Sequence, residues 1–173
     1  MTWTTFHRRG DVLRAVIATA DARRDGSLPS DVAGVSETFA DAEDLLGTLQ
    51  LKWHTRLAGR IEREQLAEPM DLRAAVVRAW RATADELPGI RAVLDAQRET
   101  PGSERAAQIM AKSAVKEHAL LAVTAGLASV QDRRAAAVGA RIEAEARAVR
   151  VAPEPEGAGP QGLFGRLRAA LAA

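Results

Sequence analysis

The sequence contains no cysteine and no tyrosine, and only 3% of its 173 residues are aromatic. The absence of cysteine excludes a disulfide scaffold, a cysteine-ligated zinc or iron–sulfur site and a cysteine nucleophile. No run approaches the roughly 18 apolar residues that a membrane span needs. The opening residues, MTWTTFHRRGD, carry early charges and no uninterrupted apolar region of the length found in signal peptides, so no secretory signal is predicted. These absences predict a cytoplasmic protein.

An excess of charge of one sign is also lacking. The formal net charge is +1, so the sequence carries no strong nucleic-acid signal. Apolar residues make up 47% of the chain, and because aromatics are scarce the core must consist of alanine and aliphatic side chains. Alanine is the best helix former, and its excess together with arginine is typical of GC-rich bacterial genes. A chain of this length buries about 70% of its unfolded surface, which is enough for one core.

Apolar residues recur with a helical period over almost the whole chain up to residue 150. Turns containing glycine or proline interrupt this pattern, and no stretch alternates long enough to predict a strand. Five helices are predicted, over 5–24, 31–67, 70–99, 103–129 and 132–150. Pro88 is expected to kink or divide the third helix. Because the turns are short, consecutive helices should pack antiparallel. The sequence therefore predicts an all-α fold, an up-down bundle of four to five long antiparallel helices.

The composition changes after residue 150. Residues 151–162 are rich in proline and glycine and are predicted to form a linker. Residues 163–173 are predicted to form a short amphipathic helix. The predicted organisation is therefore a helical bundle over 1–150, followed by the linker and a C-terminal tail helix.

Several polar side chains are expected to lie at one height near the middle of the bundle. In antiparallel neighbours, positions equally far from a turn lie level. The turn near residue 68 places His54 level with Thr83. The turn near residue 101 places Glu86 level with Glu117 and His118. Two of the three histidines therefore fall in one layer, on faces that lean inward.

This layer has three interpretations. The first is a structural layer of hydrogen-bonded histidine and glutamate that fixes the helix register, since buried polar groups need partners. The second is a metal site for iron, manganese or zinc, formed by His54, Glu86, Glu117 and His118. It is similar in outline to ferritin-like proteins, which hold two irons between four helices, but the sequence has no Glu-x-x-His motif and predicts at most a mononuclear site. The third is acid–base catalysis by a His–Glu pair.

The predicted tail helix is a separate candidate for binding. Its large apolar residues share one side, and they are Leu163, Phe164, Leu167 and Leu171. Eleven residues are too few for a helix that is stable alone, so this segment is expected to bind a surface. That surface is its own bundle, a partner protein or, more weakly, a membrane.

The sequence carries no P-loop, zinc-protease or serine-hydrolase motif. The leading prediction is therefore a non-enzymatic interaction or scaffold protein without a cofactor. It would dock a protein partner, or self-associate, through its tail or a bundle face. A metal-binding bundle is the alternative, and a small-molecule enzyme using the His–Glu pair is the third prediction.

Overall fold

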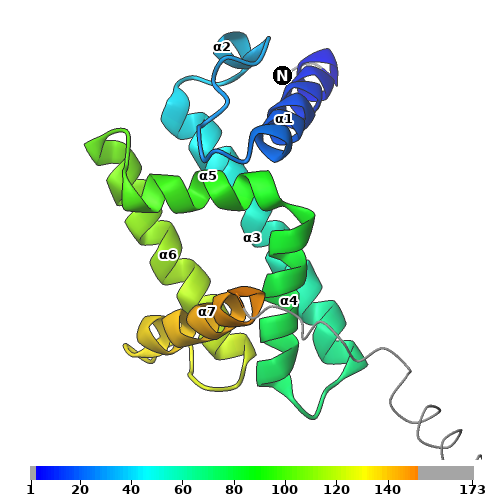
Figure 1. Ribbon diagram of the computed structural model, residues 1–173, viewed down its shortest axis with the longest axis vertical. Helices are drawn as coiled ribbons and strands as arrows, with labels where there is room; N and C mark the ends of the chain where they lie inside the picture. The colour runs from blue at the N-terminus through cyan, green and yellow to red at the C-terminus, as the bar shows by residue number, and fades with distance from the viewer. Residues whose placement is uncertain (1–2, 152–173) are drawn as a thin grey trace, which may run out of the picture.

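The computed structural model describes residues 3–151, with the side chains of residues 8–148, and this part of the chain consists of helices and loops without a strand. The helices are α1 (Trp3–Arg23), α2 (Val35–Thr38), α3 (Ala42–Ala67), α4 (Leu72–Glu86), α5 (Pro88–Glu99), α6 (Glu104–Thr124) and α7 (Ala135–Val151) (Figure 1). The all-α prediction is confirmed. None of these helices is both long enough and apolar enough to cross a membrane.

Two of the predicted segments lie outside the described residues. These are the linker beyond Val151 and the tail helix over 163–173, with its predicted partner-binding residues Leu163, Phe164, Leu167 and Leu171.

Helices α3 and α4 pack antiparallel, as predicted from their short turn. Arg56 in the middle of α3 donates to Glu86 at the end of α4 (2.8 Å). Arg78, nearly two turns after the start of α4, donates to Glu64 near the end of α3 (3.2 Å). The order of contacts is therefore reversed between the two helices.

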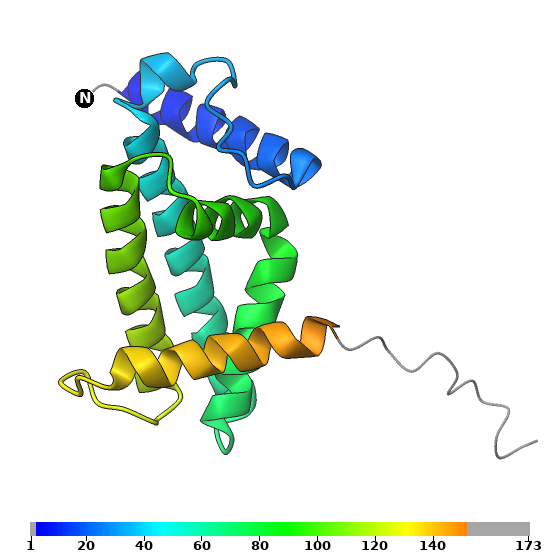
Figure 2. The same ribbon diagram turned by 60° about the vertical axis from the view of Figure 1, so that its left-hand side comes forward.

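Helices α3 and α6 instead run in the same direction. Ser103, the residue before α6, donates to Glu43 at the start of α3 (2.6 Å). At the other end, Gln65 donates to the carbonyl oxygen of Thr124 (2.6 Å). Helix α5 produces this parallel pair because it lies across the molecule from the top of α4 to the top of α6 (Figure 2). The strict up-down order therefore does not extend from α3 to α6.

The division at Pro88 is as predicted. Proline lacks a backbone donor and is tolerated in the first turn of a helix, and Pro88 occupies the first position of α5. No side chain within α5 caps its start. Asp21 of α1 supplies this cap, because its Oδ1 accepts a hydrogen bond from the backbone N–H of Gly89 (2.8 Å). The contact fixes α1 against the bend.

The prediction of one helix over 31–67 is wrong. Gly34 adopts a left-handed conformation (φ 87°), which interrupts the helical backbone before the single turn of α2. The long helix begins only at Ala42. Asp41 is its N-cap, with a side chain that accepts from the backbone N–H of Asp44 (2.7 Å). The chain therefore leaves the helical conformation twice before α3 starts, at Gly34 and again at Phe39 to Asp41.

Helix α7 crosses α6 and then α4 (Figures 1 and 2). The crossing of α6 is very close at Gly139, where an added Cβ would lie 1.8 Å from the carbonyl oxygen of His118. The crossing of α4 is held by Arg73, whose guanidinium donates twice to Glu145 (2.6 and 3.1 Å). Because α7 lies across the bundle, its side chains meet α4, α5 and α6 together.

Candidate functional site

A carboxylate lies at the centre of the core. Glu117 of α6 is fully buried, with 0% of its surface exposed. Its Oε1 accepts hydrogen bonds from the indole N–H groups of Trp53 (3.1 Å) and Trp80 (3.3 Å). The two rings meet edge to face, with centroids 5.8 Å apart. Helices α3, α4 and α6 are therefore joined through one side chain at mid-height.

Two arginines of α5 neutralise this carboxylate. Arg98 donates to Glu117 Oε2 (2.9 Å). Arg91 is buried, and its Nη1 lies 3.5 Å from Glu117 Oε1 while its Nη2 lies 2.8 Å from Asp95 Oδ1. Its guanidinium also lies 4.7 Å from the ring centroid of Trp53, a cation–π distance. Helix α5 is thus fixed to the core by charge.

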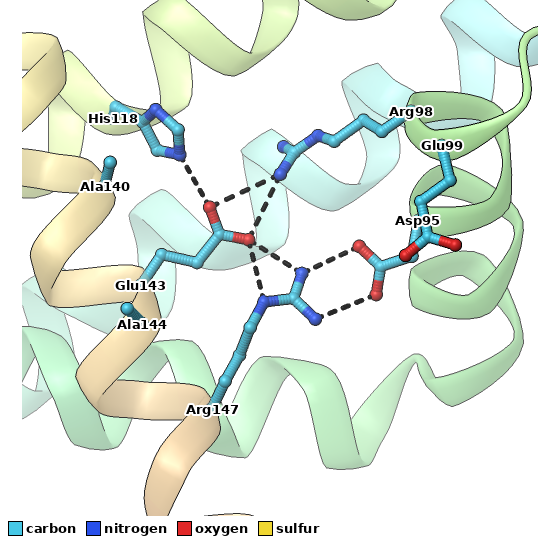
Figure 3. Close-up of a pocket in the computed structure, with 8 residues that line it drawn as sticks. All are labelled: Asp95, Arg98, Glu99, His118, Ala140, Glu143, Ala144 and Arg147. Carbon is cyan, nitrogen blue, oxygen red and sulfur yellow. Dashed lines mark hydrogen bonds and ion pairs between the residues drawn. The ribbon is translucent and has the colours of Figure 1, made fainter.

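A second buried carboxylate continues the network on α7. Glu143 accepts hydrogen bonds from Arg98 (3.1 Å) and Arg147 (2.7 Å) and lies 2.6 Å from Nε2 of His118 (Figure 3). Arg147 also donates to both oxygens of Asp95 (2.7 and 3.0 Å). Helix α7 is therefore tied to both α5 and α6.

We call this network the buried charge cluster. Its members are Arg91, Asp95, Arg98, Glu117, Glu143 and Arg147. Three positive charges balance three negative charges within it, so the cluster is neutral. Ion pairs of this kind stabilise only when they remain complete, since removing one partner leaves an uncompensated charge in a medium of low dielectric constant.

Both glutamates of the cluster have depressed pKa values. Burial raises the pKa of Glu117, but the nearby His54 and the cations of Arg91 and Arg98 outweigh burial and lower the pKa from 4.5 to about 2. Burial likewise raises the pKa of Glu143, and His118 together with the neighbouring arginines brings it well below its ordinary value. Both side chains are therefore ionised at neutral pH.

These shifts predict that the fold is sensitive to acid. A carboxylate with a depressed folded-state pKa stabilises the fold above its unfolded pKa, and this contribution is lost as the pH falls toward the folded value. For Glu117 the window extends from about pH 5 down to about pH 2, and the shift corresponds to about 3 kcal/mol. Urea unfolding at a series of pH values should therefore show stability falling steeply below pH 5. A free energy of unfolding unchanged between pH 5 and pH 3 would contradict this assignment.

An open pocket of about 430 Å³ lies beside the cluster, between α5, α6 and α7 (Figure 3). Its lining residues are Asp95, Arg98, Glu99, His118, Ala140, Glu143, Ala144 and Arg147. Most of the polar atoms in this wall already bind one another. The His118–Glu143 pair forms part of the wall, which makes it the group best placed to meet a small molecule.

The structure separates the four residues predicted to bind metal. His54 Nε2 lies 3.7 Å from Glu117 Oε2, so these two come together. His118 instead contacts Glu143. Glu86 pairs with Arg56 and lies outside the cluster. Among the described residues, no group of three or more histidine, aspartate or glutamate side chains is arranged to hold a metal ion.

Sequence reasoning missed the arginines of the cluster and Glu143. A signal was present, because charges interrupt otherwise apolar stripes. Arg91 stands four residues after Leu87 and three before Leu94 on the buried side of α5. A charged residue on the apolar stripe of one helix, together with an opposite charge on the apolar stripe of a neighbouring helix, indicates a buried ion pair.

Exposed apolar side chains occur on two segments, the α3–α4 turn and the α6–α7 loop, and both segments lie toward the same end of the molecule (Figure 2). The two segments touch, since a Cβ on Gly126 would lie 3.6 Å from Leu72 Cδ1. We call this surface the apolar end. It consists of Met70 (93% exposed), Val130 (86%), Leu66 (83%), Leu127 (49%) and Leu72 (37%). Single exposed apolar residues are ordinary, whereas grouped ones mark interaction sites.

The chain matches no protein-family model, and neither a curated protein nor a solved structure is significantly similar to it.

Proposed function

We propose that this chain is a non-enzymatic interaction protein that docks a protein partner on its apolar end. The observation that carries the proposal is the grouping of exposed apolar side chains. Of the seven large apolar side chains that are exposed in the described part of the chain, five lie at this end. The other two, Leu51 and Val115, stand apart from it on α3 and α6. Interfaces bury such groups at their centre.

The buried charge cluster supports a structural role more than a catalytic one. Glu143 is bonded to two arginines as well as to His118, so its oxygens are held within the network and are not free to accept a proton from a substrate. The pairing of Glu86 with Arg56 removes it from a shared layer with His54 and His118. These contacts favour docking over the acid–base and metal-binding alternatives.

Site-specific photo-crosslinking in cells of the source organism tests the proposal. A benzophenone amino acid placed at Met70 or Val130 should give a discrete protein adduct. The same probe at Leu51 is the matched control, because Leu51 is 66% exposed but lies away from the apolar end. Leu127→Ser should abolish the adduct while the circular dichroism spectrum stays helical.

The mass of the adduct identifies the partner. Twice the chain mass would show that a second copy docks, and any other discrete mass would show a different protein. Adducts that form equally from Leu51, or adducts that survive Leu127→Ser, would contradict docking at the apolar end. A complete absence of adducts at Met70 and Val130 would contradict it as well.

A further inference from the structure

A second pocket lies between α1, the middle of α3 and the bend between α4 and α5. Its volume is about 480 Å³, which is within the range of sites that bind small molecules. Helix α1 supplies one wall through Arg14, Ile17, Ala18 and Asp21, which share one face because they are three or four residues apart. The opposite walls come from α3 and the bend.

The walls of this pocket are held in place by contacts on both sides of it. Asp21 of α1 accepts a hydrogen bond from the backbone N–H of Gly89 (2.8 Å). A Cβ on Gly89 would lie 2.2 Å from the backbone of α1, so helix and bend are in direct contact there. Toward the start of α1, Arg9 donates to Asp44 (3.3 Å) and Thr48 (3.2 Å) of α3. The pocket is therefore preformed, which lowers the cost of ordering it around a ligand.

The α3 wall of the pocket carries more positive than negative charge. Arg56 binds Glu86 through two nitrogens (2.8 and 2.5 Å), and Arg60, one turn further along α3, lies 3.5 Å from the same carboxylate. Two cations therefore share the charge of Glu86. Lys52, one turn before Arg56, is exposed and has neither a hydrogen bond nor an ion pair among the described residues. Its ammonium group is free to meet a ligand.

The other two charged side chains of the pocket are already engaged. Arg14 of α1 pairs with Asp11, which does not line the pocket. Asp21 caps α5, where the positive end of the helix dipole balances its charge. The charge of Lys52 is therefore left without compensation, and the pocket favours an anionic group.

The remaining lining of the pocket is apolar. Leu87 is buried in the core, and Ile17 is half-buried and packs against the core. Ala18 is small and exposed, so it leaves room above them. A bare inorganic anion would leave these side chains facing water. The ligand that fits has an apolar body as well as a charged group.

We propose that this pocket binds a small anionic amphiphile, a molecule with one carboxylate or phosphate group on a short apolar chain or ring. The anionic group would pair with Lys52, and the apolar body would lie against Ile17 and Leu87. The pocket is separate from the apolar end, because Leu66 lies ten residues beyond Arg56 on α3, or about 15 Å along the helix axis. Ligand binding here is therefore a second function that does not depend on docking at the apolar end.

Titration of the ¹⁵N-labelled full chain with hexyl phosphate and with hexanoate tests the proposal. At least one of these probes should cause saturable shifts in the amide signals of residues 14–21, 52–56 and 86–89. Signals of residues 140–147, beside the other pocket, should stay in place. The probe that binds more tightly identifies the preferred head group. Hexan-1-ol and inorganic phosphate should each bind at least about ten-fold more weakly, because each offers only one of the two contacts.

Two pairs of variants assign the contacts. Lys52→Gln should weaken binding of the better probe about five-fold, the effect expected for one exposed ion pair. Lys112→Gln is the matched control, because it removes the same charge from an exposed lysine on α6. Ala18→Leu should weaken binding by filling the pocket, whereas Ala15→Leu should not, since Ala15 is exposed on the same helix but does not line the pocket.

Several results would overturn the proposal. Binding of hexan-1-ol as tight as that of the charged probes would show that Lys52 plays no part. Binding of inorganic phosphate as tight as that of hexyl phosphate would show an adventitious ion only. Equal effects of Lys52→Gln and Lys112→Gln would show that only the net charge of the protein matters. Shifts that centre on another surface, or no saturable shift with either probe, would show that the pocket takes no such ligand.

Discussion

Glu117→Gln is expected to lower the free energy of unfolding by about 3–5 kcal/mol. The amide keeps the shape of the side chain and one carbonyl oxygen for the indole N–H groups of Trp53 and Trp80. It removes the charge that balances Arg91 and Arg98, and Arg91 is only 4% exposed. An arginine cannot escape by losing its proton, so the cost of its desolvation remains without compensation.

The loss is large relative to the stability of the protein. Domains of this size are stable by about 5–15 kcal/mol, and a change of this magnitude should lower the melting temperature by about 10 °C. Glu145→Gln is a matched control, since it removes the same charge from a pair that joins α4 to α7 at the surface. Exposed pairs contribute at most about 1 kcal/mol. Urea unfolding of both variants at pH 7 gives the comparison, and equal losses would show that Glu117 is not held in a buried network.

Most of the helices could be predicted because the residues that end a helix act locally in the sequence. Pro88 cannot continue a helix, and the chain bends there as expected. The breaks before α2 and between α2 and α3 were missed for the opposite reason. Val35 and Phe39 are both buried, so the apolar pattern continues although the backbone turns. Only Gly34 and the capping side chain of Asp41 mark the interruption, and both are tolerated elsewhere in helical sequences.

The direction of α6 could not be predicted from loop length. A short turn makes neighbours antiparallel only when both helices stand along the same axis. Once Pro88 divides the predicted third helix, α5 spans the distance between α4 and α6. A proline therefore sets the relative direction of two helices that it does not belong to.

The buried face of α6 was misjudged because alanine lies on more than one side of it. His118 was predicted to lie on an inward-leaning face, whereas it is only half-buried and the buried residues include Met110, Glu117 and Leu121. Adjacent positions on a helix differ by about 100°. When small apolar residues surround a helix, the pattern does not distinguish these two faces. Glu117, not His118, is therefore the fully buried ionisable side chain on α6.

Gly139→Ala is expected to lower the free energy of unfolding by an amount similar to that expected for Glu117→Gln, here through steric overlap alone. A Cβ at this position would lie 1.8 Å from the carbonyl oxygen and 2.4 Å from the carbonyl carbon of His118. These atoms belong to the backbone of α6, so no rotamer change relieves the overlap. The helices must separate, and the buried side chains of Ile142 and Ala146 then lose contacts across the crossing. We expect a loss of at least about 3 kcal/mol, at the upper end for overpacked cores.

Gly47→Ala is the matched control, because Gly47 also lies inside a long helix but has nothing within 4 Å of an added Cβ. Alanine should raise stability there by about 0.5–1 kcal/mol, since glycine disfavours helix interiors. Hydrogen exchange distinguishes the two variants further. In Gly139→Ala the amides of α7 should exchange much faster, while those of α3 should change little. The reason is that separating α7 from α6 draws Glu143 away from its partners, which in the intact fold are His118 Nε2 at 2.6 Å and Arg98 Nη1 at 3.1 Å. If both alanine variants stabilised the protein, the close crossing of α6 and α7 would be wrong, and with it the position of α7 over the buried charge cluster.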